Sequence, residues 1–178
     1  MSPILSFPLA DEIIASFSAE LGGDFSAYRN HVCRELNFFL ALSGLSLPPT
    51  AVLVAAAFHD VGIWTHHTFD YLPPSVQLAS DYLAKVGLRE LDAEVRVMIN
   101  EHHKVLPYKG PFSPNVEAFR KADLIDLSLG LFRFGLPRSF VRSVRDALPN
   151  AGFHRRLSAL TLRQFVRTPL RPLPMFHW

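Results

Sequence analysis

Cysteine is almost absent from this chain of 178 residues, which contains Cys33 alone. A single cysteine cannot form an intramolecular disulfide, and it cannot build the thiolate clusters that hold structural zinc. Any metal bound by this chain must therefore use imidazole and carboxylate groups.

Long apolar runs are also missing. No stretch reaches the roughly 18 to 20 uninterrupted apolar residues that a membrane-spanning helix needs. The segment 1–10 lacks the basic region and the long apolar stretch of a secretory signal. We therefore expect a cytoplasmic protein that does not associate with membranes.

The alternation of polar and apolar residues that marks a strand is absent too, whereas apolar residues recur at helical spacing along most of the chain. Proline and glycine coincide with the breaks between these segments. The sequence predicts an all-α fold, a single-domain bundle of about seven or eight helices. The expected helices cover residues 10–21, 24–43, 49–61, 74–86, 88–103, 114–129, 138–148 and 152–168, with loops at 62–73 and 104–111.

Charge is distributed unevenly, although the net charge is only +2. Residues 127–178 contain nine arginines and one acidic residue, Asp146, while residues 1–126 are acidic overall. Either these arginines form a solvated face that pairs with the acidic body, or they bind an anionic substrate, a nucleic acid or a partner. The interleaved aromatic residues that stack on bases are lacking, so we do not expect nucleic acid.

Histidine is frequent, and six of the eight histidines precede Asp123. His59 and Asp60 end a strongly apolar segment, where an ionised carboxylate is expensive to bury unless it is paired or bound to a metal. His31 lies within an expected helix, and Asp123 lies on a later one. Taken alone, His31 and Asp123 are each typical of an ordinary core or salt-bridged residue. Together they offer the ligand types of a divalent metal that keeps positions open for water.

His31, the His59-Asp60 pair and Asp123, in this order and helical context, resemble the HD-domain superfamily of metal-dependent phosphohydrolases. The resemblance covers residues 26–130 and includes the segments 56–62 and 99–103. It implies a helical metal-binding core over this range. The ligands that it implies are His31, His59, Asp60 and Asp123.

A pair of neighbouring histidines, His102 and His103, adds further candidate ligands, because such a pair serves this purpose in family members with two metals. Neighbouring side chains on a helix point about 100° apart, so both can face one site only if the helix end unwinds. Ser75 stands where a dinuclear member is expected to carry another histidine. We therefore expect one divalent transition metal per chain, Mn, Fe, Zn, Co or Ni.

Candidate catalytic groups lie near these ligands in the sequence. His66 and His67, in the loop after the His-Asp pair, are candidates for an acid, a base or a substrate ligand, with an exposed loop position as the alternative. Three cations could offset charge on a phosphate group, or could be ordinary surface residues. These are Arg34, Lys104 and Lys121.

The resemblance implies a hydrolase that acts on a phosphate ester or nucleotide-type substrate, so we expect a small anionic substrate. Three alternatives stay open: hydration of a small neutral nitrile-like substrate, di-iron oxygenase chemistry, and a non-catalytic protein with a structural metal that binds a partner. We expect arginine-rich helices at 131–168. The tail at 169–178, rich in proline and aromatic residues, suits an extended arm on the body or on a second subunit of a homodimer.

Overall fold

Ten α-helices and two short 3₁₀ helices make up the described part of the chain, and no strand occurs there. The computed structural model describes residues 2–68 and 70–167. Eight of the α-helices contain eight residues or more, which confirms the predicted all-α fold. The elements are α1 (Pro8–Ala15), α2 (Ser18–Leu21), η1 (Gly22–Asp24), α3 (Phe25–Ser43), α4 (Thr50–Phe58), α5 (Gly62–Thr65), α6 (Leu72–Val86), η2 (Arg89–Leu91), α7 (Asp92–Glu101), α8 (Ser113–Leu127), α9 (Arg138–Ala147) and α10 (Phe153–Arg167).

The helix boundaries differ from the predicted ones in two places. The predicted helix 10–21 is divided into α1 and α2, and the hydroxyl of Ser16 donates a hydrogen bond to the carbonyl of Ile13 at the break. Such a side chain competes with the backbone for helical hydrogen bonds. The predicted loop 62–73 is partly helical, because it contains α5 and the start of α6.

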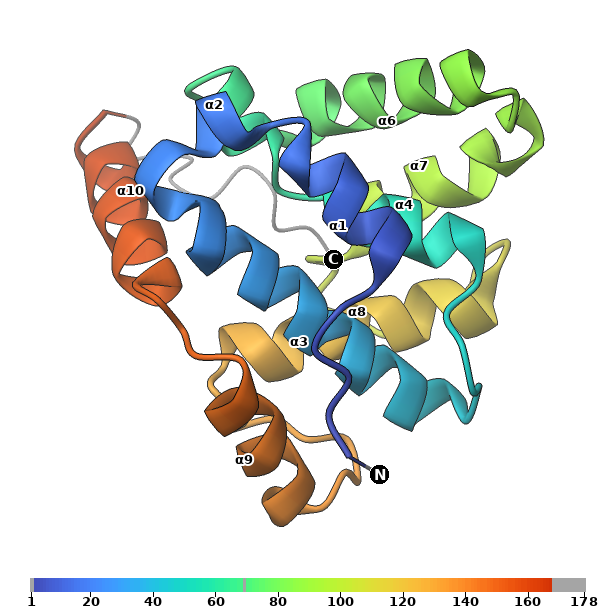
Figure 1. Cartoon of the computed structure of the whole chain (residues 1–178), viewed down its shortest axis with the longest axis vertical. Helices are drawn as coiled ribbons and strands as arrows, with labels where there is room; N and C mark the ends of the chain where they lie inside the picture. The colour runs from blue at the N-terminus through green and yellow to red at the C-terminus, as the bar shows by residue number, and fades with distance from the viewer. Residues whose placement is uncertain (1, 69, 168–178) are drawn as a thin grey trace.

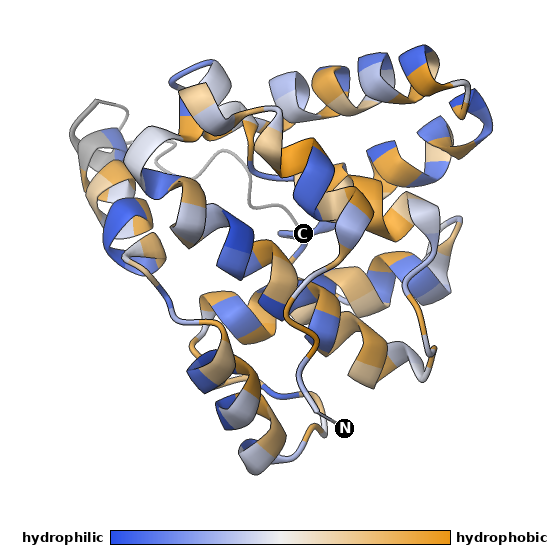
Figure 2. Ribbon diagram, in the orientation of Figure 1, coloured by the Kyte–Doolittle hydropathy of each residue, from blue (hydrophilic) through white to orange (hydrophobic). Residues whose placement is uncertain are grey.

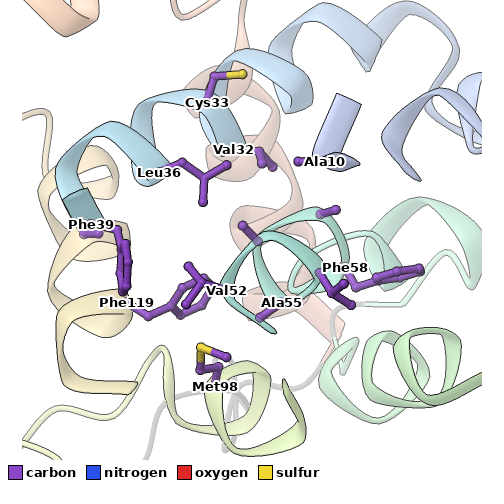
Figure 3. Packing of buried hydrophobic residues seen from close by; sticks show 14 of the residues in the cluster. Ala10, Val32, Cys33, Leu36, Phe39, Val52, Ala55, Phe58, Met98 and Phe119 are labelled. Atoms are coloured by element: carbon purple, nitrogen blue, oxygen red, sulfur yellow. The ribbon is translucent and has the colours of Figure 1, made fainter. Parts of the chain in front are cut away.

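The core is organised around α4, a short helix whose residues are almost all buried. Figure 3 shows Val52, Ala55 and Phe58 of this helix within the cluster, with Leu36 of α3 on one side and Met98 of α7 on another. The long helix α3 crosses the middle of the molecule and packs on α8 (Figure 1). These contacts bring the end of α4 close to both α3 and α8.

The arginine-rich part folds onto the same body, since both α9 and α10 contact α3. The guanidinium of Arg156 pairs with the carboxylate of Asp24 at 3.1 Å. Among the later arginines whose side chains the structure describes, no other one forms an ion pair with the acidic body. Within the described residues, the predicted pairing of the arginine-rich part with the acidic body therefore rests on one ion pair. The predicted tail 169–178 lies outside the described residues.

Figure 2 shows hydrophilic and hydrophobic residues mixed along α9. The most apolar helix, α4, has nine residues, which is far shorter than a bilayer crossing requires. Over residues 2–68 and 70–167, no helix combines the length and the apolar character needed to cross a membrane.

The thiol of Cys33 should react very slowly in the native protein. This side chain is fully buried on α3, and burial raises its pKa to about 12, so little reactive thiolate forms at neutral pH. We expect Ellman's reagent to label Cys33 only after unfolding. A Cys33→Ala/Ser46→Cys variant, with the thiol in an exposed loop, should be labelled at once. Equally fast labelling of both proteins would contradict this packing.

Candidate metal centre

Four side chains from three parts of the fold converge at the centre of the molecule. His31 comes from α3, His59 and Asp60 follow the end of α4, and Asp123 lies on α8. The Nε2 atom of His31 lies 3.0 Å from Nε2 of His59, 3.8 Å from Oδ2 of Asp60 and 3.7 Å from Oδ1 of Asp123. All four residues are buried. The structure thus brings together the four ligands that the resemblance implies.

The two facing Nε2 nitrogens of His31 and His59 are both acceptors when the two rings are neutral. His31 uses Nδ1 to donate to Asp126 at 2.7 Å, and His59 uses Nδ1 to donate to the carbonyl of Ala56 at 2.8 Å. A neutral imidazole has one N–H, so each Nε2 carries a lone pair. Two lone pairs 3.0 Å apart repel each other unless a cation or a proton lies between them.

Two helices end at a histidine of this centre in the same way. His59 donates from Nδ1 to the carbonyl of Ala56, and His102 donates from Nδ1 to the carbonyl of Ile99 at 2.7 Å. Each ring thereby satisfies a carbonyl that the end of a helix leaves without a partner. The same bond fixes the ring and turns Nε2 toward the centre. Local structure at the ends of α4 and α7 therefore orients the ligands.

His102 and His103 both face the centre, as their prediction as ligands requires. They follow α7 in a turn, so the helix end is unwound and the two ring centroids lie 3.9 Å apart. The Nε2 atom of His102 lies 3.5 Å from Asp60, and Nδ1 of His103 lies 3.5 Å from Asp123. The hydroxyl of Tyr71 contacts Nε2 of His103 at 2.8 Å.

Several buried atoms of this centre have no hydrogen-bond partner in the described part of the chain. They include Oδ1 of Asp60, Oδ2 of Asp123 and Nε2 of His102. Unsatisfied acceptors are costly in a buried site, and a divalent cation would satisfy them together. Their types, imidazole nitrogen and carboxylate oxygen, are ligands of first-row transition metals. The residues present therefore fit a divalent metal.

The pKa of His59 reflects the negative charge of this cluster. Burial alone would lower that pKa, but the neighbouring carboxylates, Asp60 first among them, raise it to about 10. Without a metal, a proton on His59 offsets part of the surrounding negative charge. A divalent cation would replace this proton, since a ligating imidazole must be neutral.

Behind His31 lies an ion pair that sequence reasoning missed. Arg34 donates to both oxygens of Asp126, at 2.6 and 2.7 Å, and Asp126 accepts from His31. Burial alone would raise the pKa of Asp126, but the hydrogen bonds from His31 and Arg34 hold it below its usual range. Asp126 is three residues after Asp123, so the spacing in the sequence already places both on one face of a helix.

Glu35 is a second group that sequence reasoning missed. It is fully buried one helical turn after His31, and its carboxyl lies 3.7 Å from Nδ1 of His59. Burial, opposed in part by His59, raises the pKa of Glu35 well above its usual range. The spacing of four residues from His31 was a signal that could have found it.

The C-terminal part of the chain also touches the centre. The ring of Phe153, at the start of α10, stacks on His31 with centroids 4.1 Å apart. His154 contacts the carbonyl oxygens of Asp126 and Leu127 through Nε2 at 3.1 and 3.2 Å. The ring of Phe153 thus covers one face of His31.

The predicted catalytic residues occupy varied positions. Arg34 is buried with Asp126, on the side of His31 that faces away from the other ligands. His66 and His67 are exposed, and the Nδ1 atom of His66 contacts Thr65. Lys104 lies 3.8 Å from Glu101, and Lys121 lies 3.3 Å from Glu117. Their roles in a reaction stay predictions.

Ser75, which replaces an expected histidine, has a packing role. Its hydroxyl oxygen accepts a hydrogen bond from the backbone N–H of Gly62 at 3.0 Å. A Cβ atom at Gly62 would lie 2.5 Å from the carbonyl oxygen of Tyr71 and 2.8 Å from Oγ of Ser75. Small residues are thus required where α5 meets α6.

Comparisons with known proteins leave the site to be interpreted from its own geometry. No family, no curated protein and no solved structure matches the chain. The described residues form a helical fold with buried histidine and carboxylate groups that could bind a metal.

Replacing Arg34 should reveal how strongly it supports the centre. Arg34→Met should lower the free energy of unfolding by about 3–5 kcal/mol, because it leaves the buried Asp126 without its cation. Arg34→Lys should cost less, since lysine keeps the charge but loses the two parallel hydrogen bonds. Urea unfolding followed by circular dichroism measures both.

A control for this prediction lies on the same helix. Arg29 pairs with Asp11 in a partly exposed position, so Arg29→Met should cost no more than about 1 kcal/mol. If Arg34→Met costs no more than Arg29→Met, the buried pair is not a major support of the centre.

Proposed function

We propose that this protein is a metal-dependent hydrolase of the HD-domain type that acts on a small phosphate ester. The observation that carries the proposal is the approach of the two Nε2 atoms of His31 and His59 to 3.0 Å beside two buried carboxylates. This arrangement supports one divalent metal held by His31, His59, Asp60 and Asp123. Three or four protein ligands leave positions for water and substrate.

A divalent metal held there would polarise an ester and lower the pKa of water from about 15.7 toward about 7. The protein's own groups orient the ligands: Asp126 accepts from His31, and helix-end carbonyls accept from His59 and His102. Such partners of ligating histidines fix the ring orientation and raise the basicity of the ligand nitrogen.

His103 is the group best placed to handle a proton. It is the least buried of the clustered histidines, and its Nδ1 atom lies 3.5 Å from Asp123. Burial and the neighbouring His102 lower the pKa of His103 well below its usual value, so its imidazole is neutral. A neutral imidazole can accept a proton at Nδ1, and the Tyr71 hydroxyl at 2.8 Å from Nε2 orients the ring.

The phosphate ester is favoured by the resemblance to the HD-domain superfamily. A second candidate, hydration of a small neutral nitrile-like substrate, is favoured by the positions of two predicted cations. Arg34 is paired with Asp126, and Lys121 is paired with Glu117. Cations with such partners are less available to a phosphate group.

Metal content tests the ligand set. The protein purified without added metal should contain about one equivalent of Mn, Fe, Co, Ni or Zn per chain, as measured by elemental analysis. Asp60→Ala should retain almost none, because it removes a buried ligand. Asp81→Ala, which removes an exposed carboxylate on α6, should bind as much as the unmodified protein. Absence of metal, even after supplementation, would contradict the proposal, and two equivalents of iron would favour an oxygenase.

Turnover tests the reaction. Metal-loaded protein should hydrolyse p-nitrophenyl phosphate or a nucleoside monophosphate, and activity should fall to background in Asp60→Ala but not in Asp81→Ala. Release of inorganic phosphate is the measurement. Turnover of a nitrile without any turnover of phosphate esters would select the second candidate. Full activity of Asp60→Ala would overturn the site itself.

A further inference from the structure

A second polar site lies outside the metal centre, beside α9. It is a pocket of about 580 Å³ between α9 and the connection from α8 to α9. Five arginines line it, together with a single acidic residue. They are Arg34, Arg133, Arg138, Arg142, Arg145 and Asp146.

The arginines of α9 lie on one face of the helix. Arg138, Arg142 and Arg145 are spaced at four and three residues, so successive turns present them to the same side. Val141 and Val144 of the same helix are buried, so packing of this apolar side sets the orientation of α9. The cationic face is thereby held toward the pocket.

These cations have little negative charge to neutralise them. In the part of the chain that the structure describes, Arg133, Arg138 and Arg142 have no ion-pair partner, and Arg145 donates to the carbonyl of Leu129 at 2.7 Å. Guanidinium groups gathered in a concave site repel one another, and an anion with several oxygens relieves the repulsion through charge-assisted hydrogen bonds.

The connection 128–133, which forms the wall of the pocket opposite α9, packs tightly against that helix. Gly130 has a φ of +81°, and a Cβ atom there would lie 2.8 Å from the side chain of Val141. Leu129 also has a positive φ, of 56°, and its carbonyl accepts from Arg145. A backbone conformation that side chains disfavour is thus held in place by contacts with α9.

We propose that this pocket binds a soluble phosphorylated small molecule at a site separate from the metal centre. Its volume falls within the roughly 300–1,000 Å³ of small-molecule sites. Arginine forks match the geometry of phosphate oxygens. The pocket is walled by α9 on one side and by the 128–133 connection on the other, which suits a compact ligand better than an extended membrane surface.

The pocket shares one side chain with the support of the metal centre. Arg34 lines the pocket, donates from Nη1 to the carbonyl of Leu148 at 2.9 Å, and holds Asp126 with its other donors. Asp126 in turn accepts from the metal-ligand candidate His31. The two sites are therefore neighbours, but the assignment of the pocket does not rest on the proposed hydrolase activity.

Inorganic phosphate is a probe for this site. In a titration of ¹⁵N-labelled protein followed by NMR, we expect the largest amide shifts at Gly130, Arg142 and Asn150. Arg138→Gln/Arg142→Gln removes two exposed arginines and should raise the Kd for phosphate at least about tenfold. The control Lys85→Gln/Arg89→Gln removes two exposed cations from the far end of α6 and from η2, and should change the Kd less than about twofold. Figure 1 shows that α6 and α9 lie at opposite ends of the molecule.

The same titration separates the two sites. In Asp60→Ala, the shifts around the pocket should persist, which would show that phosphate binding there does not depend on the metal ligands. Shifts confined to residues around Asp123 and His103 would overturn the proposal. An equal loss of phosphate affinity in both double variants would also overturn it. Binding to vesicles containing phosphatidylserine, without phosphate-dependent shifts at the pocket, would also overturn it.

Discussion

Burial of negative charge is the constraint on which this structure depends. Four carboxyl groups lie inside the helical bundle, and each must be neutralised, paired or protonated, because an isolated buried carboxylate is prohibitively expensive. Asp126 is paired with an arginine, and burial raises the pKa of Glu35 well above its usual range, which favours its neutral form. Asp60 and Asp123 face Nε2 nitrogens of His31 and His59, which are acceptors when the rings are neutral. The carboxylates of Asp60 and Asp123 therefore leave a deficit of positive charge that a metal would remove.

Much of the fold could be predicted because its determinants are local. Proline and glycine mark the helix breaks, and apolar spacing marks the helices between them. The four principal ligand candidates could also be named, since adjacent His59 and Asp60 stand out after an apolar segment and the order of the others resembles a known family. The two wrong predictions also have local causes or effects: Ser16 lies where a predicted helix is divided, and six residues of a predicted loop, 62–65 and 72–73, are helical.

The partners of the ligands could not be predicted, because they depend on contacts across the folded chain. Arg34 and Asp126 are separated by 92 positions in the sequence, and nothing in their local surroundings reveals that they pair. The position of Arg34, buried behind His31, likewise depends on the fold and could not be predicted from the sequence. The uneven charge of the chain indicated an anion site among several possibilities, but only the fold gathers particular arginines in one pocket.

Phe153 covers His31 although it lies more than 20 residues beyond the end of the core implied by the family resemblance, residue 130. A side chain from the last described helix is thus part of the immediate environment of His31, the first candidate ligand. The arginine-rich segment is therefore not an appendage that can be removed without exposing the candidate metal centre. Shortened versions that end near residue 130 would lose the ring that covers one face of His31, so a fragment that keeps this candidate centre covered has to extend at least through the start of α10.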